Sequence, residues 1–254
     1  MAMTSISEIV VERAMRFIAR CLAAGRLKTV ANGIENLPQD GPAVIVMRHY
    51  HHLFDGLTIF AAVKRRFHIV VTLDWVRTKA GKIFMQSINR IARWPTLLRR
   101  DALNRHAGRQ GSLFSPGDVV SYQREAMIQA VELLVQGRII VIFPEGYPNI
   151  DPTYTPKTDL EEFLPFRSGF VSFVRAAEIH LGNKIPIIPA GVRYEHGKPW
   201  TGFLRFGQAL YRQDLASREE LIERLETEVK KLSGIALKAG SSVTAGVPAK
   251  RNVA

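Results

Sequence analysis

Three of the chain's seven histidines fall within the stretch MRHYHHLFDGL, residues 47–57, which also holds an Asp-Gly pair. An imidazole beside a carboxylate suits proton transfer. The carboxylate fixes the tautomer and orientation of the ring and stabilises the imidazolium, while the second ring nitrogen can remove a proton from a bound hydroxyl group. The stretch therefore predicts a histidine–aspartate dyad, with Asp55 as the carboxylate and His49 or His51 as the general base.

Imidazole and carboxylate groups also bind zinc and iron, so a metal site is the alternative. Its ligands would be His49, His51, His52 and Asp55. Neighbouring ligands on so short a segment rarely converge on one ion, and no distant His/Glu pair stands out to complete the shell. Cys21 is the only cysteine, which excludes a thiolate cluster and a disulfide framework. No Gly-x-Ser-x-Gly stretch occurs, so the sequence favours direct transfer to an acceptor that the base activates.

A second informative stretch is IIVIFPEGYPN, residues 139–149. An apolar run that ends in Phe-Pro predicts a buried strand followed by a turn. Glu145 would then lie at the edge of a sheet where functional groups gather, and Gly146 would let the backbone approach a ligand closely. A plain turn after a strand is the simpler interpretation of these two residues.

The apolar pattern predicts the elements that position both stretches. We expect strands at residues 41–49, 67–74, 95–100, 138–146, 184–194 and 202–210. We expect helices at residues 5–25, 52–66, 79–94, 122–137, 168–182 and 217–234. Long loops should occupy residues 101–118 and 150–166. Strands that alternate with helices predict an α/β fold with a mostly parallel central sheet flanked by helices.

The composition and net charge of the chain indicate which kinds of molecule it could bind. The chain has 254 residues, 46% of them hydrophobic, and a formal net charge of +12. This positive charge predicts an anionic partner: nucleic acid, an acidic membrane surface or a phosphorylated substrate. The basic residues are dispersed and form no recognised nucleic-acid motif, which argues against nucleic acid. No apolar run approaches 18 residues, so we expect no transmembrane helix, and the N-terminus is a poor signal peptide.

The N-terminal segment, residues 1–35, is predicted to contain an amphipathic helix. Its apolar stripe includes Val10 and Phe17, and three arginines lie largely off that stripe: Arg13, Arg16 and Arg20. This arrangement suits either a helix at a membrane interface or an ordinary helix packed on the domain. Residues 36–236 should form the main domain, and residues 237–254 a flexible basic tail.

These motifs together resemble the glycerolipid acyltransferase family, which includes the lysophosphatidate (1-acylglycerol-3-phosphate) acyltransferases. Members carry Asn-His-x-x-x-x-Asp after a strand led by Gly-Pro, then an apolar strand ending in Arg, a Phe-Pro-Glu-Gly-Thr-Arg-Ser stretch and an apolar Ile-x-Pro-x strand. The counterparts in this chain are RHYHHLFD, TLLRR, FPEGYPN and PIIPAGV. All four occur in the family's order over roughly residues 40–195, which makes the joint pattern specific.

The resemblance implies an O-acyltransferase of phospholipid biosynthesis. It would move an acyl chain from acyl-CoA or acyl carrier protein to a hydroxyl group of a lysophospholipid or glycerol-phosphate-like acceptor. It implies no metal or prosthetic group, because the thioester is a substrate. Arg99, with Arg100, resembles the phosphate-binding arginine, Glu145 and Gly146 resemble the acceptor-binding segment, and Arg167 is a further candidate. With the single cysteine and the positive charge, we expect a cytoplasmic protein that binds the inner face of an anionic membrane peripherally.

The chain departs from the family pattern at three points. Counting back five residues from Asp55 gives Tyr50, which cannot be the base, Thr-Arg-Ser is replaced by YPN, and no Asp precedes the arginines of LLRR. Six residues separate Gly41-Pro42 from His49, as in the family, so this register selects His49, with His51 as the alternative. The departures also leave open a peripheral lipid-binding protein on a catalytically degenerate acyltransferase scaffold.

Overall fold

The structure of the protein is a computed structural model that describes residues 6–106 and 113–235. Within these ranges, six strands form one sheet in the order β1-β8-β7-β2-β6-β3. Every neighbouring pair in it is parallel except β7 and β8. The strands are β1 (Leu27–Asn32), β2 (Ala43–Met47), β3 (Phe67–Ile69), β6 (Ile139–Ile142), β7 (Ile187–Glu195) and β8 (Trp200–Phe206). A separate parallel pair consists of β4 (Val71–Thr72) and β5 (Thr96–Leu97).

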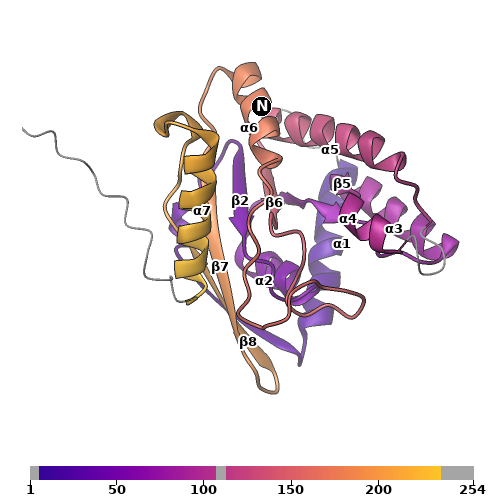
Figure 1. Cartoon of the computed structure of the whole chain (residues 1–254). Coiled ribbons are helices and arrows are strands. Elements are labelled where there is room, and N and C mark those ends of the chain that lie inside the picture. Colours follow the sequence, from indigo (N-terminus) through magenta and orange to yellow (C-terminus); the bar gives the residue numbers. More distant parts are fainter. Residues whose placement is uncertain (1–5, 107–112, 236–254) are drawn as a thin grey trace, which may run out of the picture.

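Helices cover both faces of the six-stranded sheet (Figure 1). The α-helices are α1 (Ile6–Ala23), α2 (Phe54–Ala62), α3 (Lys79–Ala92), α4 (Arg100–His106), α5 (Asp118–Val135), α6 (Phe170–Leu181) and α7 (Arg218–Leu232), and the short 3-10 turns are Ile34–Asn36 and Arg212–Asp214. The alternation of side chains along β2 explains the two layers, because successive residues of a strand point to opposite faces. Val44 and Val46 pack with α5, α6 and α7, whereas Ile45 and Met47 pack with α1 and α2.

The predicted mostly parallel sheet flanked by helices is confirmed, but several boundaries were wrong. The apolar run 67–74 is two short strands in different sheets, because the chain leaves the main sheet after Ile69. The loop predicted at 101–118 holds α4 and the start of α5, while its residues 107–112 lie outside the described ranges. Strand β1 was not predicted. Among the described strands it pairs with β8 alone, at the edge of the sheet, and it shows no clean apolar alternation.

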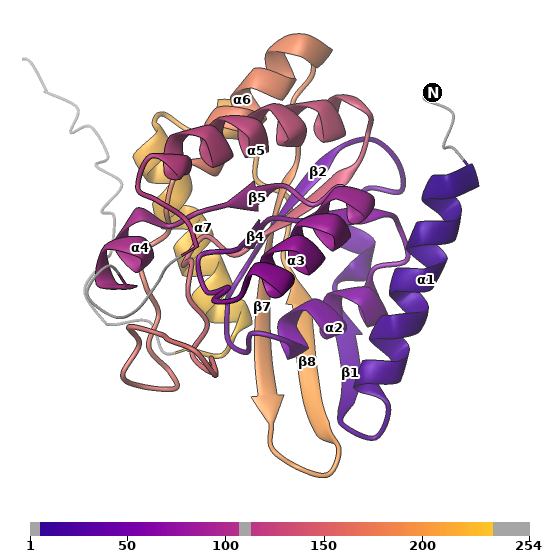
Figure 2. The ribbon, with the colours of Figure 1, turned by 90° about the vertical axis from the view of Figure 1, so that its right-hand side faces the viewer.

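Helix α1 packs along α2 and also contacts α3, and Figure 2 shows these three helices side by side. Arg16, predicted to belong to a basic face with Arg13 and Arg20, instead donates hydrogen bonds to carbonyl groups at and just after the end of α2, including that of Val63 at 2.9 Å. No helix in the described part of the chain is long and apolar enough to span a bilayer. The predicted division at residues 35 and 236 stays a prediction, and the tail, residues 237–254, lies outside the described ranges.

Candidate active site

The three central strands, β2, β6 and β7, run parallel to one another, so their carboxyl ends meet at one edge of the sheet. His49 lies two residues after β2, and Glu145 lies three residues after β6. Tyr194 is near the end of β7. Residues far apart in the sequence therefore surround one point, at the edge where ligands bind in open parallel sheets.

The histidine–aspartate dyad forms at this edge between His49 and Asp55. His49 Nδ1 lies 2.9 Å from Asp55 Oδ2, and Asp55 is buried in the first turn of α2. The His49 ring stacks on Phe143, with ring centroids 4.5 Å apart, and its side chain remains 18% exposed. Because Nδ1 is hydrogen-bonded to the Asp55 carboxylate, Nε2 is the ring nitrogen that can contact a substrate.

Asp55 is held in place by donors on both of its oxygens. Oδ2 also accepts hydrogen bonds from the backbone N–H groups of Tyr50, at 2.7 Å, and His51, at 3.1 Å. Oδ1 accepts a hydrogen bond from the hydroxyl of Tyr194 at 2.8 Å. Burial raises the pKa of Tyr194 well above its ordinary value, and the charge of Asp55 raises it further, so this residue remains a neutral donor. These hydrogen bonds stabilise the ionised carboxylate and fix its plane.

His51, the alternative base, has a different set of contacts. Its Nδ1 accepts hydrogen bonds from the backbone N–H groups of Leu53, at 3.2 Å, and Phe54, at 3.3 Å, so that nitrogen carries no proton and caps α2. Burial lowers the pKa of His51 to about 4, and the neighbouring His52 contributes to the shift. Strand β2 ends at Met47, before either histidine. The structure brings the ring of His49, and not that of His51, to the Asp55 carboxylate.

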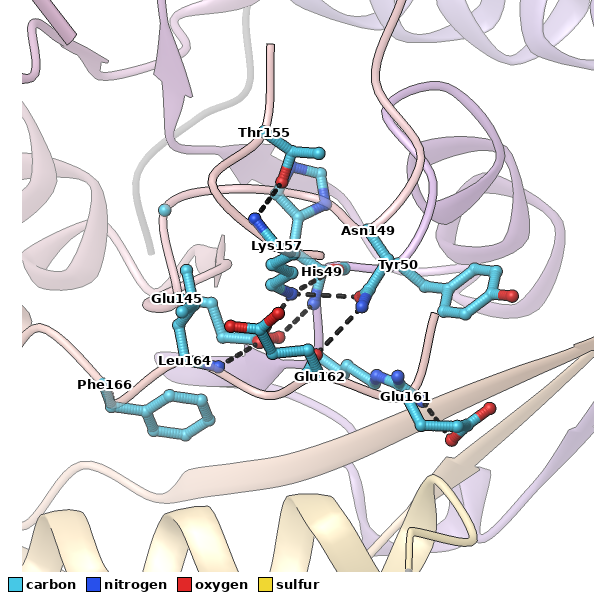
Figure 3. Close-up of polar contacts among 12 residues, drawn as sticks. His49, Tyr50, Glu145, Asn149, Thr155, Lys157, Glu161, Glu162, Leu164 and Phe166 are labelled. Carbon is cyan, nitrogen blue, oxygen red and sulfur yellow. Dashed lines mark hydrogen bonds and ion pairs between the residues drawn. The ribbon is translucent and has the colours of Figure 1, made fainter. Parts of the chain in front are cut away.

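Glu145 forms a buried ion pair with Lys157 around the backbone of His49 (Figure 3). One carboxylate oxygen of Glu145 accepts the N–H of His49 at 2.8 Å, and the other accepts the N–H of Leu164 at 3.0 Å and contacts Lys157 Nζ at 2.6 Å. Lys157 Nζ also donates to the carbonyl of His49 and to Asn149 Oδ1, both at 3.0 Å. Burial lowers the pKa of Lys157, and the charge of Glu145 opposes that shift. Both backbone polar groups of His49 are thus held by one ion pair.

Gly146 has the backbone conformation that its position requires. Its φ is 76°, in the left-handed region that favours glycine, and its N–H closes a turn onto the carbonyl of Phe143. A Cβ atom there would lie 3.2 Å from Arg167 Nε. The Gly146 carbonyl accepts a hydrogen bond from Arg99 Nη1. Gly146 therefore lets the chain reverse direction after β6 and directs its own carbonyl toward Arg99.

Arg99 follows β5 and reaches the same edge of the sheet. There it meets the carboxylate of Asp74, the last residue of the strand predicted at 67–74. Its Nε and Nη2 contact Asp74 at 2.6 and 3.0 Å, and its guanidinium lies 3.9 Å from the centre of the Tyr147 ring. The bonds to Asp74 and Gly146 use three of the five N–H groups of a guanidinium. Arg99 lines the pocket beside His49.

The other two candidate arginines lie further out. Arg100 is exposed at the first residue of α4. Arg167 is half exposed and donates to Asp101 at 3.0 Å, and Asp101 also accepts the Tyr147 hydroxyl at 2.8 Å. Burial on its own raises the pKa of Asp101, but the hydrogen bonds from Arg167 and Tyr147 outweigh it and lower that pKa to about 2. Neither Arg100 nor Arg167 is among the described residues that line the pocket.

The pocket next to the dyad has a volume of about 400 Å³ and mostly apolar walls. Its lining includes His49 and Asp55 at the dyad and apolar side chains from α1, α2, α3 and neighbouring segments, among them Ile18, Leu22, Phe60, Met85 and Trp94. Such a cavity suits a hydrocarbon chain whose reactive end lies at the imidazole. Among the described residues, no group of three or more His, Cys, Asp or Glu side chains is placed to hold a metal ion.

Four residues of this site escaped the sequence analysis: Asp74, Phe143, Lys157 and Tyr194. Asp74 ends an apolar run and Phe143 belongs to the FPEG stretch, so both were in positions where a strand-end rule could have found them. Tyr194 lies at the end of the predicted 184–194 strand, where the same rule applies. Lys157 lies in a long loop without periodicity, and no sequence signal marks it.

A histidine–aspartate dyad and an FPEG turn at the carboxyl edge of a mostly parallel sheet are the features of an acyltransferase domain. The family model described as Acyltransferase matches residues 28–193, which is more than half of the chain, and the chain belongs to that family. The predicted family resemblance is thereby confirmed. A search of curated protein sequences gave no match.

Among solved structures, the chain is similar to the 1-acyl-sn-glycerophosphate (LPA) acyltransferase PlsC from Thermotoga maritima. The two chains have a TM-score of 0.59 and 19% sequence identity, and the match covers 94% of this chain and 86% of the other. At this level of identity the similarity shows a shared fold.

Proposed function

We propose that the protein transfers an acyl chain from acyl-CoA or acyl carrier protein to a hydroxyl group of a lysophospholipid or glycerol-phosphate-like acceptor. The observation that carries this proposal is the hydrogen bond between His49 Nδ1 and the buried Asp55 carboxylate. His49 also lines the apolar pocket. The Acyltransferase family match supports the reaction class, and the name of the PlsC structure supports the acceptor class. The proposal includes no metal or prosthetic group.

In the proposed reaction, His49 Nε2 takes the proton from the acceptor hydroxyl as its oxygen attacks the thioester carbonyl. Asp55 stabilises the imidazolium that forms. Collapse of the tetrahedral intermediate breaks the carbon–sulfur bond, the imidazolium returns the proton to the departing thiolate, and an ester and a free thiol are released. No covalent acyl-enzyme is required, and Phe143 and Asp55 keep the ring in one orientation throughout.

The proposal is tested by thiol release from acyl-CoA, and separately from acyl carrier protein, across a panel of lysophospholipid acceptors. Thiol release that depends on the acceptor and yields an esterified lipid is the expected result. Saturable lysophospholipid binding without thiol release from either donor would reject catalysis and favour a lipid-binding protein on the same scaffold.

Arg99 is proposed to bind the acceptor's phosphate through the N–H groups that Asp74 and Gly146 leave unused. In an Asp74→Asn background, which avoids a buried unpaired carboxylate, Arg99→Ala should raise KM for a phosphorylated acceptor about thirtyfold and change kcat little. The loss of a charge-assisted hydrogen bond of about 2 kcal/mol gives this factor. Rates with lysophosphatidate and with monoacylglycerol measure it, and the uncharged acceptor should show no such change. Arg100→Ala is the matched control, and an effect there alone would move the phosphate to Arg100.

We further propose that the protein binds the inner face of an anionic membrane through α1 and α3. Exposed apolar side chains lie on both neighbouring helices: Val10, Phe17 and Ile18 on α1, and Ile83, Phe84 and Ile91 on α3. Exposed basic side chains lie on the same helices: Arg13, Arg20, Lys79 and Arg90. Apolar residues flanked by basic ones suit an anionic lipid surface. Since α1 also lines the pocket, this orientation places the pocket near the lipid.

Substituting Val10 and Phe17 with serine should reduce sedimentation with anionic vesicles several-fold, because both side chains would lose contact with the acyl region. High salt should release the wild-type protein, since each basic residue near the surface contributes about 1 kcal/mol that salt screens. Ile179→Ser on α6 is the matched control, because Ile179 is 70% exposed and Phe17 is 67% exposed. Equal loss in both proteins would show that α1 has no special role.

A further inference from the structure

Tyr194 connects β7 to the dyad from the side opposite His49. Its hydroxyl donates to Asp55 Oδ1 at 2.8 Å, whereas His49 contacts Oδ2 of the same carboxylate. Tyr194 is 7% exposed, and its ring lies against those of Tyr50, Phe54 and Trp200, with centroids 5.4, 6.2 and 6.3 Å away. A buried tyrosine hydroxyl needs a hydrogen-bond partner. Here the partner is the carboxylate that orients the base.

We propose that Tyr194 is a positioning residue of the dyad, which fixes the plane of the Asp55 carboxylate and draws negative charge away from the oxygen that faces His49. The inference rests on the proposed function for its effect on turnover, but the hydrogen bond itself exists in the free protein. Thr58 supports the arrangement, because its hydroxyl lies beside that of Tyr194 and donates to the Asp55 carbonyl at 2.8 Å.

The effect of removing the Tyr194 hydroxyl on the protonation of His49 depends on the other groups around the Asp55 carboxylate. The turn contributes His51 and Tyr50 through their N–H groups, and the buried Lys157 lies near enough to act through charge, with Glu145 and Arg48 near Lys157. None of these groups changes in a Tyr194→Phe variant. With one donor lost, Asp55 retains more negative charge and stabilises the imidazolium of His49 more strongly. Neutral imidazole, the form that accepts a proton, then prevails only at higher pH.

The experiment compares wild type, Tyr194→Phe and Tyr122→Phe. The control variant also loses a tyrosine hydroxyl that makes a hydrogen bond, here one accepted from Gln86 at 2.7 Å. Tyr122 lies on α5, outside the dyad. The ring of His49 is titrated by ¹⁵N NMR in the free enzyme and assigned with His49→Gln. In Tyr194→Phe, the titration midpoint and the acidic limb of the kcat/KM profile should both move up by roughly half a pH unit. We also expect kcat to fall about tenfold, as for other residues that orient a functional histidine.

A fluorinated residue gives a second test that keeps the hydroxyl and the fold. In Tyr194→3-fluorotyrosine the hydroxyl is a stronger donor, so the midpoint should move to lower pH. An unchanged midpoint in both Tyr194 variants would overturn the proposal, as would an equal shift in Tyr122→Phe. Midpoints that move in the expected directions in a protein that releases no thiol would support the role of Tyr194 and reject the proposed function instead.

Discussion

Replacing His49 with alanine is expected to reduce acyl transfer by about a hundred- to ten-thousand-fold, the usual contribution of a general base. The loss should appear in kcat and in kcat/KM together, because the imidazole acts in the transition state. The fold should persist, since the Glu145–Lys157 pair holds the backbone of residue 49 rather than its ring. Thiol release and circular dichroism measure the two properties in one preparation.

His51→Ala is the matched control for His49→Ala, because it removes a neighbouring imidazole whose Nδ1 caps α2. It should cost roughly tenfold through local packing. Asp55→Asn should impair the enzyme severely, because the amide neither orients the imidazole correctly nor stabilises its charged form. An active His49→Ala enzyme combined with an inactive His51→Ala enzyme would transfer the role of base to His51.

Lys157→Met is expected to lower the free energy of unfolding by about 3–5 kcal/mol, because it leaves the Glu145 carboxylate buried without its counter-charge. The side chains of both residues are fully buried, so water cannot compensate. The His49 carbonyl also loses a donor, and acyl transfer should fall with stability. Urea denaturation at pH 7 measures the change.

The matched control for Lys157→Met is Lys184→Met, which removes the cation of an exposed ion pair with Asp214. Exposed pairs contribute at most about 1 kcal/mol. The double variant Lys157→Met/Glu145→Gln removes both charges and should be more stable than Lys157→Met alone. If the single variant is as stable as wild type, the buried pair does not anchor His49.

The sequence predicted best those features that local order determines. Apolar runs marked the central strands, and the distance from Gly41-Pro42 selected His49, whose ring the structure brings to Asp55. Short elements were missed because tertiary contacts, rather than local sequence, determine whether they form. Strand β1 forms by pairing with β8, and α4 lies in a segment whose composition is that of a loop.

The sequence predicted where functional residues lie better than it predicted which partners their side chains contact. A strand-end rule placed Glu145 at the right edge of the sheet, but its partner Lys157 comes from a loop whose path no periodicity describes. Arg99 was predicted as a phosphate ligand from the resemblance, while its pairing with Asp74 depends on how two short strands lie together. Such pairings follow from tertiary packing, which a single sequence does not display.

The dyad and its supports span most of the chain, and this has a consequence for folding during synthesis. Lys157 contacts residue 49 across 108 positions, and Tyr194 contacts Asp55 across 139. Contacts of such high sequence separation form slowly, because a long loop must close before they do. Chains emerge from the ribosome N-terminus first. A nascent chain that has emerged only as far as Gly146 therefore has both residues of the dyad but neither Lys157 nor Tyr194. The completed site thus forms only once β7 has been synthesised and has paired with β2.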